Sequence, residues 1–344
     1  MKPTKVLLAA VVAGFFANLA AAQAPQSETI AFSHKIPTKW EYVLPRETWT
    51  PVSNGINIAH AGGAAFAAEV QGSALAVDTN GDGKVDDKAK GISAELALKA
   101  KSIDGRTLNY GIRLVKTGEA WSYAAGGAMV GKARGETIAV IDQNNNGNYN
   151  DYGTDAMVVG GGEAAAFLSR VVNLGGDLFN FEINADGSSA TLTAWEGEAG
   201  VLDVRKGFEG KGDIKAVVVS NERGDVSFNA ASTKKGLKIP AGNWVITSGL
   251  VSQGSESVRL AQGNMAAIAV SKDANTEMSW GGPISIDFQY AINGDKLTVP
   301  YNLKYYGRSG EEYREFLPDA TSPQIVVMDK KKRILLSTSR FPGC

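Results

Sequence analysis

Short runs of β-branched or alternating apolar residues, each ended by glycine, asparagine, aspartate or proline, recur along almost the whole chain. The sequence has 40 glycines among 344 residues, and long stretches with helical spacing are scarce. This pattern is typical of strands joined by tight turns, because glycine and asparagine adopt the backbone conformations that such turns require. The sequence therefore predicts an all-β fold, with strands at 73–77, 137–141, 156–159, 190–194, 215–219, 243–247, 296–299 and 324–328.

Local turn residues add detail to this prediction. Asp186-Gly187 and Asn293-Gly294 each lie between two predicted strands, and both dipeptides favour the positive φ angles of two-residue hairpin turns. The best helix candidate is the short apolar stretch 164–171.

The N-terminal residues follow the basic, apolar and small-residue order of a secretory signal peptide. Lys2 and Lys5 precede an apolar stretch at 6–19, and three alanines follow at 20–22. We therefore predict a signal peptide over residues 1–22, with cleavage after Ala22, and a secreted, periplasmic or cell-surface location. The apolar stretch is shorter than the roughly 20 residues that cross a bilayer, so no membrane span is expected.

The charge balance limits the classes of partner that can be expected, and the cysteine content limits the sources of stability. The 35 Lys and Arg nearly balance the 36 Asp and Glu, so no large field of one sign predicts a nucleic acid partner. The single cysteine, Cys344, has no internal partner for a disulfide. Stability outside the cell must then come from packing and, as the loops below suggest, from metal.

The mature chain is long enough for several domains. A glycine-rich, charged stretch at 206–212 resembles a linker. We predict an N-terminal β domain over 23–203 and two small β-sandwich modules over 204–276 and 277–344. The stretch 236–245 reads as strand, Pro/Gly corner and strand, and it resembles small sandwich modules of the prealbumin or immunoglobulin type.

The loop at 78–87 carries the most specific chemistry. Oxygen-bearing side chains alternate there, a glycine follows at the sixth position, and more carboxylates come after it. Calcium takes six to eight oxygens, and a chain wrapping it supplies them from positions one, three, five, seven and nine. The predicted ligands are the side chains of Asp78, Asn80, Asp82 and Asp86, the carbonyl of Lys84, and Asp87 as an additional carboxylate.

This loop resembles the calcium loops of EF-hand, dockerin and thrombospondin type 3 repeats. It departs from the EF-hand at position twelve, where Ala89 replaces a bidentate glutamate, and a predicted strand precedes it in place of a helix. A structural site with a weak affinity, of about 10⁻⁴ to 10⁻³ M, fits better than a sensor. The alternative is a polar turn without metal.

A second loop, at 142–151, repeats the same order of residues after the predicted strand at 137–141. The spacing suggests a duplicated strand and loop unit. Asparagine also favours left-handed turns without metal, so this loop has a second explanation. Its predicted ligands are the side chains of Asp142, Asn144, Asn146 and Asn150, the carbonyl of Asn148, and Asp151 or Asp155.

Together these features resemble those of exported bacterial β-rich proteins that combine a segment like 141–157 with a closing sandwich domain. The resemblance spans most of the mature chain and implies no particular activity. Only the calcium loops carry chemistry that the sequence can interpret.

Enzyme motifs are weak. The run 160–165 matches a dinucleotide fingerprint, but too few residues follow it for the helix of a βαβ unit. His34 and His60 lie far apart, and no motif nominates a nucleophilic serine. Glu311, Glu312 and Glu315 are carboxylates of the type that hydrolyse glycosides, although solvated loop charges explain them more simply. We therefore predict a protein that is not an enzyme.

Two aromatic clusters suggest an alternative function. Tyrosines at 301, 305, 306 and 313 accompany Phe316, and Trp40, Tyr42 and Trp49 lie near the mature N-terminus. Flat aromatic faces on a β scaffold stack on sugar rings, although core packing is their more common role. The primary prediction is a calcium-binding structural or adhesion protein whose partner is a cell-surface glycan or another surface protein. A carbohydrate-binding protein comes second and a secreted hydrolase third.

Overall fold

The computed structural model describes residues 27–53, 55–300, 302–319 and 321–341. The predicted signal peptide, Tyr301 and Cys344 lie outside these residues. The fold is all-β, as predicted, and each of the eight predicted strands overlaps an observed one. The only helix within the described ranges is a single 3-10 turn, η1, at Ala230–Ser232.

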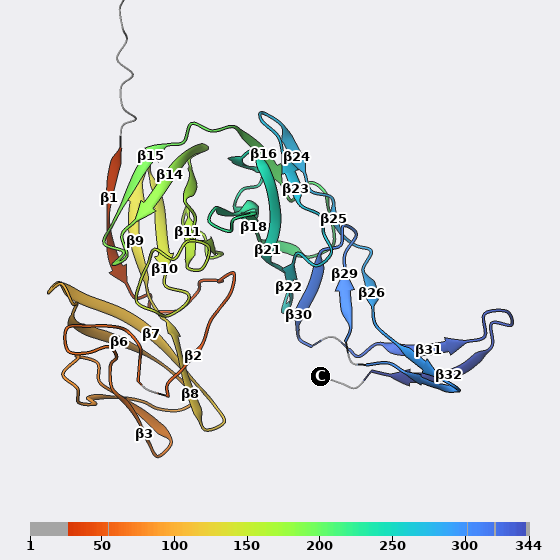
Figure 1. Ribbon diagram of the computed structural model, residues 1–344, viewed down its shortest axis with the longest axis horizontal. Helices are drawn as coiled ribbons and strands as arrows, with labels where there is room; N and C mark the ends of the chain where they lie inside the picture. The colour runs from red at the N-terminus through yellow and green to blue at the C-terminus, as the bar shows by residue number, and fades with distance from the viewer. Residues whose placement is uncertain (1–26, 54, 301, 320, 342–344) are drawn as a thin grey trace, which may run out of the picture.

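The first body contains three sheets around one apolar core (Figure 1). Its largest sheet has the order β12-β11-β10-β9-β1-β15-β14-β13, and two smaller sheets have the orders β2-β8-β7-β6 and β3-β4-β5. The strands are β1 (Glu28–Lys35), β2 (Thr50–Pro51), β3 (Ala68–Gln71), β4 (Ala74–Val77), β5 (Asp87–Ala89), β6 (Ser93–Lys101), β7 (Thr107–Thr117), β8 (Ala120–Ala125), β9 (Ala128–Ala133), β10 (Glu136–Ile141), β11 (Ala156–Val159), β12 (Ala166–Phe167), β13 (Val171–Leu174), β14 (Asp177–Ile183) and β15 (Ser189–Ala194).

Strand β1 shows why these segments form sheets. Its burial alternates, so Ile30 and Phe32 face the core while their neighbours face outward, as a period of two requires. The first half of β1 pairs with β15 and the second half pairs with β9. The N-terminal strand therefore joins the two halves of the largest sheet.

The second body has its own core, centred on Trp244 and Trp280. Its main sheet has the order β19-β18-β21-β22-β30-β29-β26, with β23 also paired to β21, and smaller sheets have the orders β20-β16-β24 and β17-β25. The strands are β16 (Ala199–Asp203), β17 (Phe208–Glu209), β18 (Asp213–Asn221), β19 (Ser227–Asn229), β20 (Leu237–Pro240), β21 (Gly242–Gln253), β22 (Glu256–Ala261), β23 (Ile268–Val270), β24 (Asn275–Glu277), β25 (Trp280–Gly281), β26 (Ser285–Asp287), β29 (Lys304–Tyr306) and β30 (Glu312–Leu317). Packing of sheets around apolar cores fits the predicted β-sandwich type.

Strand pairing crosses the predicted domain boundaries. Strand β16 pairs with β20 and β24, so the second body begins at Ala199. The main sheet joins β22 to β30, so strands from 204–276 and 277–344 share one sheet. The glycine-rich stretch 206–212 is not a free linker, because Phe208 packs on Trp280 with ring centroids 4.4 Å apart.

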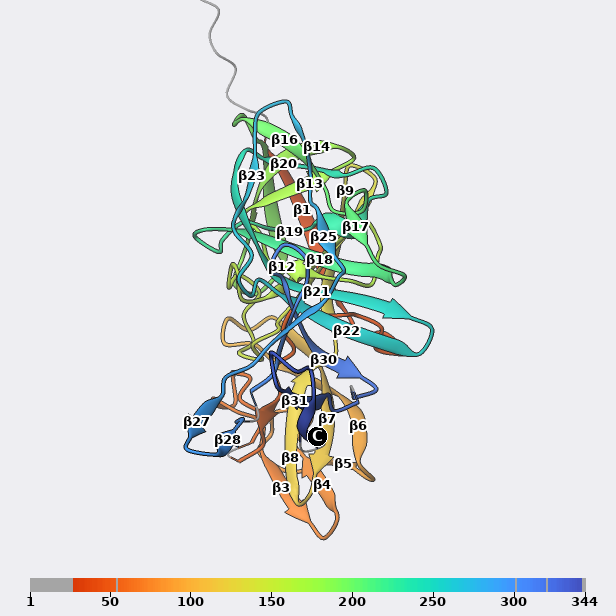
Figure 2. The same ribbon diagram turned by 90° about the vertical axis from the view of Figure 1, so that its right-hand side faces the viewer.

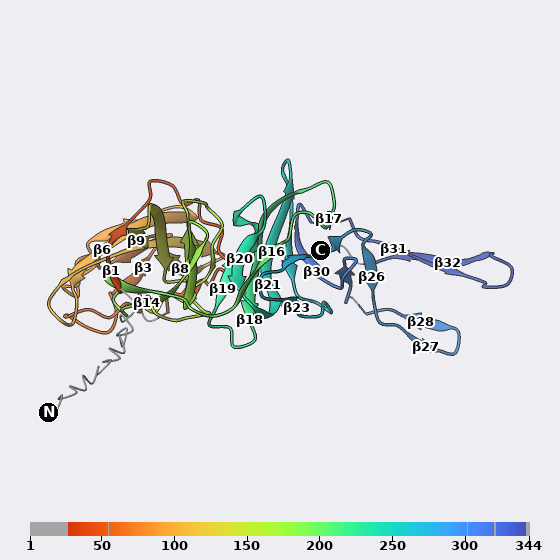
Figure 3. The same ribbon diagram turned by 90° about the horizontal axis from the view of Figure 1, so that it is seen from above.

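Two ribbons extend from the second body (Figures 2 and 3). They are formed by β27 (Ala291–Asn293) with β28 (Lys296–Thr298), and by β31 (Gln324–Met328) with β32 (Leu335–Arg340). Gly294 and Asp295 form the turn of the first pair, one residue later than predicted, because Asn293 itself pairs with Lys296. Residues 184–188, which include Asp186-Gly187, join β14 to β15, so both predicted hairpins are confirmed. Gly187 and Gly294 have φ of 70° and 64°, as these turns require.

The predicted helix at 164–171 is wrong. This segment contains β12 and the start of β13, and it runs between the two bodies, where Ala166 and Phe167 contact Val218. Ser227 N donates to Ser169 Oγ at 3.0 Å, and Arg170 N donates to Asp225 O at 2.9 Å. Because both bodies cover it, its apolar residues are continuous in sequence, and a short helix produces the same pattern.

No helix among the residues that the structure describes has the length and the apolar character to cross a membrane.

Candidate functional site

Both predicted calcium loops connect neighbouring antiparallel strands. The loop at 78–87, here called loop one, joins β4 to β5. The loop at 142–155, here called loop two, joins β10 to β11. The two loops, which are similar to each other in sequence, therefore also have the same position in a hairpin.

The loops also share three hydrogen bonds. The glycine at position six donates its N–H to the first aspartate, from Gly83 to Asp78 Oδ2 at 2.9 Å and from Gly147 to Asp142 Oδ2 at 2.6 Å. The side chain at position five accepts from the N–H at position seven in both loops. The asparagine at position three donates to a later carboxylate, from Asn80 to Asp86 and from Asn144 to Asp151.

In loop one, Asp78 is buried with 1 % exposure. Besides the bond from Gly83, its Oδ1 accepts the N–H groups of Asn80 and Gly81 at 3.1 and 2.7 Å. Gly81 has φ of 75°, and a Cβ there would lie 2.5 Å from the His60 ring. Loop one therefore folds tightly around one carboxylate, and His60 packs against it.

The other predicted ligands of loop one are exposed. Asp86 turns back toward the start of the loop, where Oδ1 accepts from Thr79 Oγ1 at 2.7 Å and Oδ2 accepts from Asn80 Nδ2 at 2.7 Å. Asp82 Oδ1 accepts from Lys84 N at 2.9 Å. Asp87 lies apart and accepts from Lys88 N. The structure thus brings Asp86 to Asn80 and leaves Asp87 outside the group.

Loop two has a more buried centre. Asp142 has no exposed surface, and its carboxylate accepts from Tyr110 Oη at 2.7 Å and from Asn146 N at 3.1 Å, in addition to Gly147. Burial raises the pKa of Asp142 to about 6, against the lowering effect of these donors. Burial also raises the pKa of Tyr110 and Tyr149.

Asp155 is a second fully buried carboxyl beside Asp142. Its oxygens accept the N–H groups of Gln143 at 3.3 Å and Asp151 at 3.1 Å. Burial and then the charge of Asp142 raise the pKa of Asp155 to about 8. Burial and mutual repulsion disfavour the ionised forms of these two carboxyls. A bound cation, or a proton on one of them, would lower this energetic cost.

Three predicted ligands of loop two converge. The Nδ2 atoms of Asn144 and Asn146 both donate to Asp151 Oδ2, at 2.8 and 2.6 Å. Asn144 Oδ1 is buried and has no hydrogen-bond partner. A buried polar atom without a partner is rare in a folded protein and requires an explanation.

The residues at loop positions two and four, Gln143 and Asn145, attach loop two to neighbouring segments. Asn145 is buried, accepts from Ala125 N at 2.8 Å, and donates to Thr48 O at 2.8 Å. Gln143, also buried, accepts from Arg46 N and donates to Thr154 O. These roles could not be predicted from the sequence, because the alternating pattern directs attention to loop positions one, three, five, seven and nine.

The remaining predicted ligands of loop two are more exposed. Asn148 is exposed and its N–H bonds to Asn146, while Asn150 is half-buried and its carbonyl accepts from Tyr152 N. Within the described parts of the chain, no three His, Cys, Asp or Glu side chains are grouped closely enough to hold a metal. A cation in either loop would therefore depend on amide and backbone oxygens as well as on carboxylates.

The aromatic clusters contribute to packing. Tyr306 and Tyr313 are buried, and Tyr305 meets Phe316 edge-on at 5.1 Å against the second core. These four rings do not form the flat exposed platform that stacking on a sugar requires. Near the N-terminus, the Arg113 guanidinium lies 3.9 Å from the ring centroid of Trp40. Tyr42 meets Trp40 edge-on, and Trp49 lies on Arg113 as well.

Glu311 differs from the solvated loop charge that the sequence favours. It is fully buried, and Oε1 accepts from Gly281 N at 2.7 Å and Tyr313 Oη at 3.2 Å, while Oε2 accepts from Ser309 N at 3.1 Å. These bonds tie β25 and β30 to the turn before β30. Glu311 is thus a structural carboxylate, whereas Glu315 is exposed and pairs with Arg259.

The histidines are packed against neighbouring residues. His60 stacks on Phe66 with centroids 4.1 Å apart. His34 stacks on Tyr110, and a Cβ at Gly127 would lie 2.4 Å from the His34 ring. Burial lowers the pKa of His34 to about 4.

We expect NMR titration of the folded protein to give His34 a midpoint near 4, well below its ordinary value of about 6.5. Below pH 6.5 His34 is protonated in the unfolded chain but stays neutral in the folded chain. The free energy of unfolding therefore decreases as pH falls from about 6.5 to 4. Titration in urea provides the control. A midpoint near 6.5 in the folded state would contradict the burial of this ring.

Comparison of the chain with protein-family models, with curated proteins and with solved structures finds no match to any of them.

Proposed function

We propose that this protein is an exported, non-enzymatic structural or adhesion protein whose first body is stabilised by calcium in its two Asp/Asn/Gly loops. The observation that carries the proposal is the buried Asn144 Oδ1, which has no hydrogen-bond partner. The Nδ2 atom of the same side chain donates to the Asp151 carboxylate. Side-chain amides have nearly the same shape in either orientation. Rotation of the Asn144 amide would direct its carbonyl oxygen toward Asp151, where a cation would bind both oxygens.

The donor set fits a hard cation. In loop two, Asn144, Asn146 and Asp151 would hold it, with Asn148 and Asn150 as further oxygen donors. In loop one, the corresponding residues are Asn80, Asp82 and Asp86, with the Lys84 carbonyl. Calcium prefers such carboxylate, amide and carbonyl oxygens, and it accepts irregular geometry more readily than magnesium does. Its chemistry here is charge neutralisation, which would offset the buried negative charge of loop two.

Thermal unfolding of residues 23–344 in calcium and in EDTA tests this proposal. With Kd values of about 10⁻⁴ to 10⁻³ M, 10 mM free calcium adds about 1.4 to 2.7 kcal/mol for each occupied loop. We expect a higher melting temperature in calcium than in EDTA. Identical melting curves for the unmodified protein would remove the proposal.

Two variants assign the effect to each loop, each compared with its own curve in EDTA. Asn144→Leu should lose the increment of loop two, because leucine has a similar volume and no oxygen. Asp82→Ala should lose the increment of loop one. Asn180→Leu, which changes an exposed asparagine of β14, is the matched control and should keep the full calcium response.

A further inference from the structure

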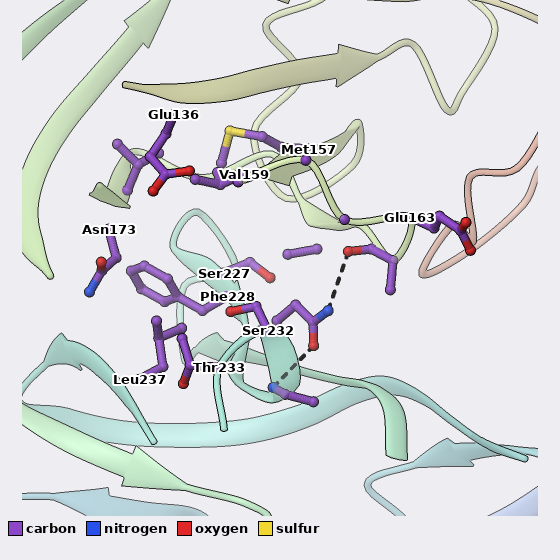
Figure 4. A pocket seen from close by; sticks show the side chains of 18 of the residues that line it. Glu136, Met157, Val159, Glu163, Asn173, Ser227, Phe228, Ser232, Thr233 and Leu237 are labelled. Atoms are coloured by element: carbon purple, nitrogen blue, oxygen red, sulfur yellow. Dashed lines mark hydrogen bonds between the residues drawn. The ribbon is translucent and has the colours of Figure 1, made fainter. Parts of the chain in front are cut away.

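A cleft with a volume of about 1000 Å³ lies between the two bodies. Figure 4 shows Glu136, Met157 and Val159 on the wall formed by the first body, opposite Phe228, Thr233 and Leu237 on the wall formed by the second. Its volume is at the upper end of the range of ligand pockets, and such pockets occur preferentially between domains.

Four sheet edges meet at this cleft. Strands β12 and β13 are the two ends of the largest sheet, and β19 and β20 are end strands of sheets in the second body. Each contributes lining residues, among them Ala166, Asn173, Phe228 and Leu237. An edge strand carries a row of backbone N–H and C=O groups that no neighbouring strand uses, which is a template for a further strand.

Some of these edge groups are already engaged. Asn173 Nδ2 donates to Lys238 O at 2.8 Å, which uses one carbonyl of β20. Asn229 Nδ2 of β19 donates to Ala164 O, just before β12, at 3.3 Å. Side-chain hydrogen bonds therefore join the two walls of the cleft at two points.

Glycines leave the rim of the cleft open. A Cβ at Gly161, Gly162, Gly175 or Gly176 would have no atom within 4 Å, and all four line the cleft. Bare backbone at the rim allows the main chain of a ligand to approach closely.

The side chains in the cleft combine an apolar interior with charged margins. Met157, Val159 and Leu237 supply the apolar surface, while Glu136 and Glu163 outnumber the single cation, Lys215. The one aromatic side chain of the lining, Phe228, packs edge-on against Trp244 with ring centroids 5.6 Å apart. Phe228, Met157 and Leu237 are all mostly buried, so each presents only a small surface to the cleft.

We propose that this cleft binds an extended polypeptide segment by strand addition to the edges of β13 and β20, where the segment would replace the bond from Asn173 Nδ2 to Lys238 O. Main-chain hydrogen bonds would supply the affinity, as in other cases where a peptide extends a sheet. Apolar side chains at alternate positions would enter between Met157, Val159 and Leu237. A basic residue of the segment would face Glu136 or Glu163.

Selection from a phage-displayed library of random dodecapeptides, followed by fluorescence polarisation with the selected peptide, tests this proposal. We expect selected sequences with alternating apolar residues and at least one Lys or Arg. Gly162→Trp should weaken binding by about tenfold or more, because the indole would occupy part of the cleft that the peptide needs. Position 162 tolerates this change, since its φ is not positive and the space around it is empty.

Val70→Trp is the matched control, because it adds an indole on exposed β3, outside the cleft, and should change binding by less than about twofold. Glu136→Lys should weaken the selected peptide and Lys215→Glu should strengthen it. Hydrogen exchange should slow at 172–174 and 237–239 when the peptide binds. Failure to select any peptide above background, or equal binding to Gly162→Trp, would overturn the proposal.

Discussion

Replacing Asp142 by alanine is expected to lower the free energy of unfolding by about 3 to 5 kcal/mol when measured in EDTA. The carboxylate is fully buried and accepts from Tyr110 Oη and from the N–H groups of Asn146 and Gly147. Alanine leaves these three donors without an acceptor in an environment that water does not reach. Urea unfolding followed by intrinsic fluorescence measures the loss.

Asp82→Ala provides the comparison within loop one. Asp82 is exposed, and its side chain accepts one backbone bond, from Lys84 N. Its removal in EDTA should cost less than about 1 kcal/mol. Equal losses for the two variants would show that burial does not distinguish the two loops.

Replacing Glu311 by alanine is expected to destabilise the second body by a similar amount, about 3 to 5 kcal/mol. Gly281 N, Ser309 N and Tyr313 Oη all donate to its carboxylate, and Gly307 packs directly against it. Loss of this acceptor would leave polar groups of two strands and one turn unsatisfied. The same urea experiment applies, with near-ultraviolet circular dichroism reporting on the tryptophans of this body.

Two further variants make the result specific to buried hydrogen bonding. Glu311→Gln keeps one acceptor oxygen and should recover part of the loss. Glu315→Ala removes an exposed carboxylate whose ion pair with Arg259 spans 3.2 Å, and surface pairs contribute about 1 kcal/mol or less. A large loss at Glu315, or none at Glu311, would contradict the roles that we assign to these residues.

Local patterns in the sequence predicted much of the fold. Strands such as 156–159 and the turns at Asp186-Gly187 and Asn293-Gly294 follow from periodicity and from positive φ at glycine, which neighbouring residues determine. The segment 164–171 could not be read in this way. Its burial comes from a second body that joins it only after residue 199, so nothing nearby in the sequence reveals it.

The candidate site was predictable to a similar extent. The alternation of Asp and Asn located both loops, and the shared bonds of Asp78 and Asp142 reflect it. The sequence favoured loop one because it has more carboxylates. The structure places the more buried carboxylates in loop two, where Tyr110 arrives from β7 and Asp155 from the end of the loop. Burial of this kind depends on tertiary packing that composition cannot show.

The place of β1 in the largest sheet affects the order in which the chain can fold. Glu28 pairs with Leu192, 164 residues later, and Phe32 pairs with Gly131. At synthesis rates of about 5 to 20 residues per second, the first strand waits about 8 to 33 s for its last neighbour to be made. Non-local pairing of this type slows folding. The largest sheet therefore cannot be completed until almost the whole first body has been synthesised.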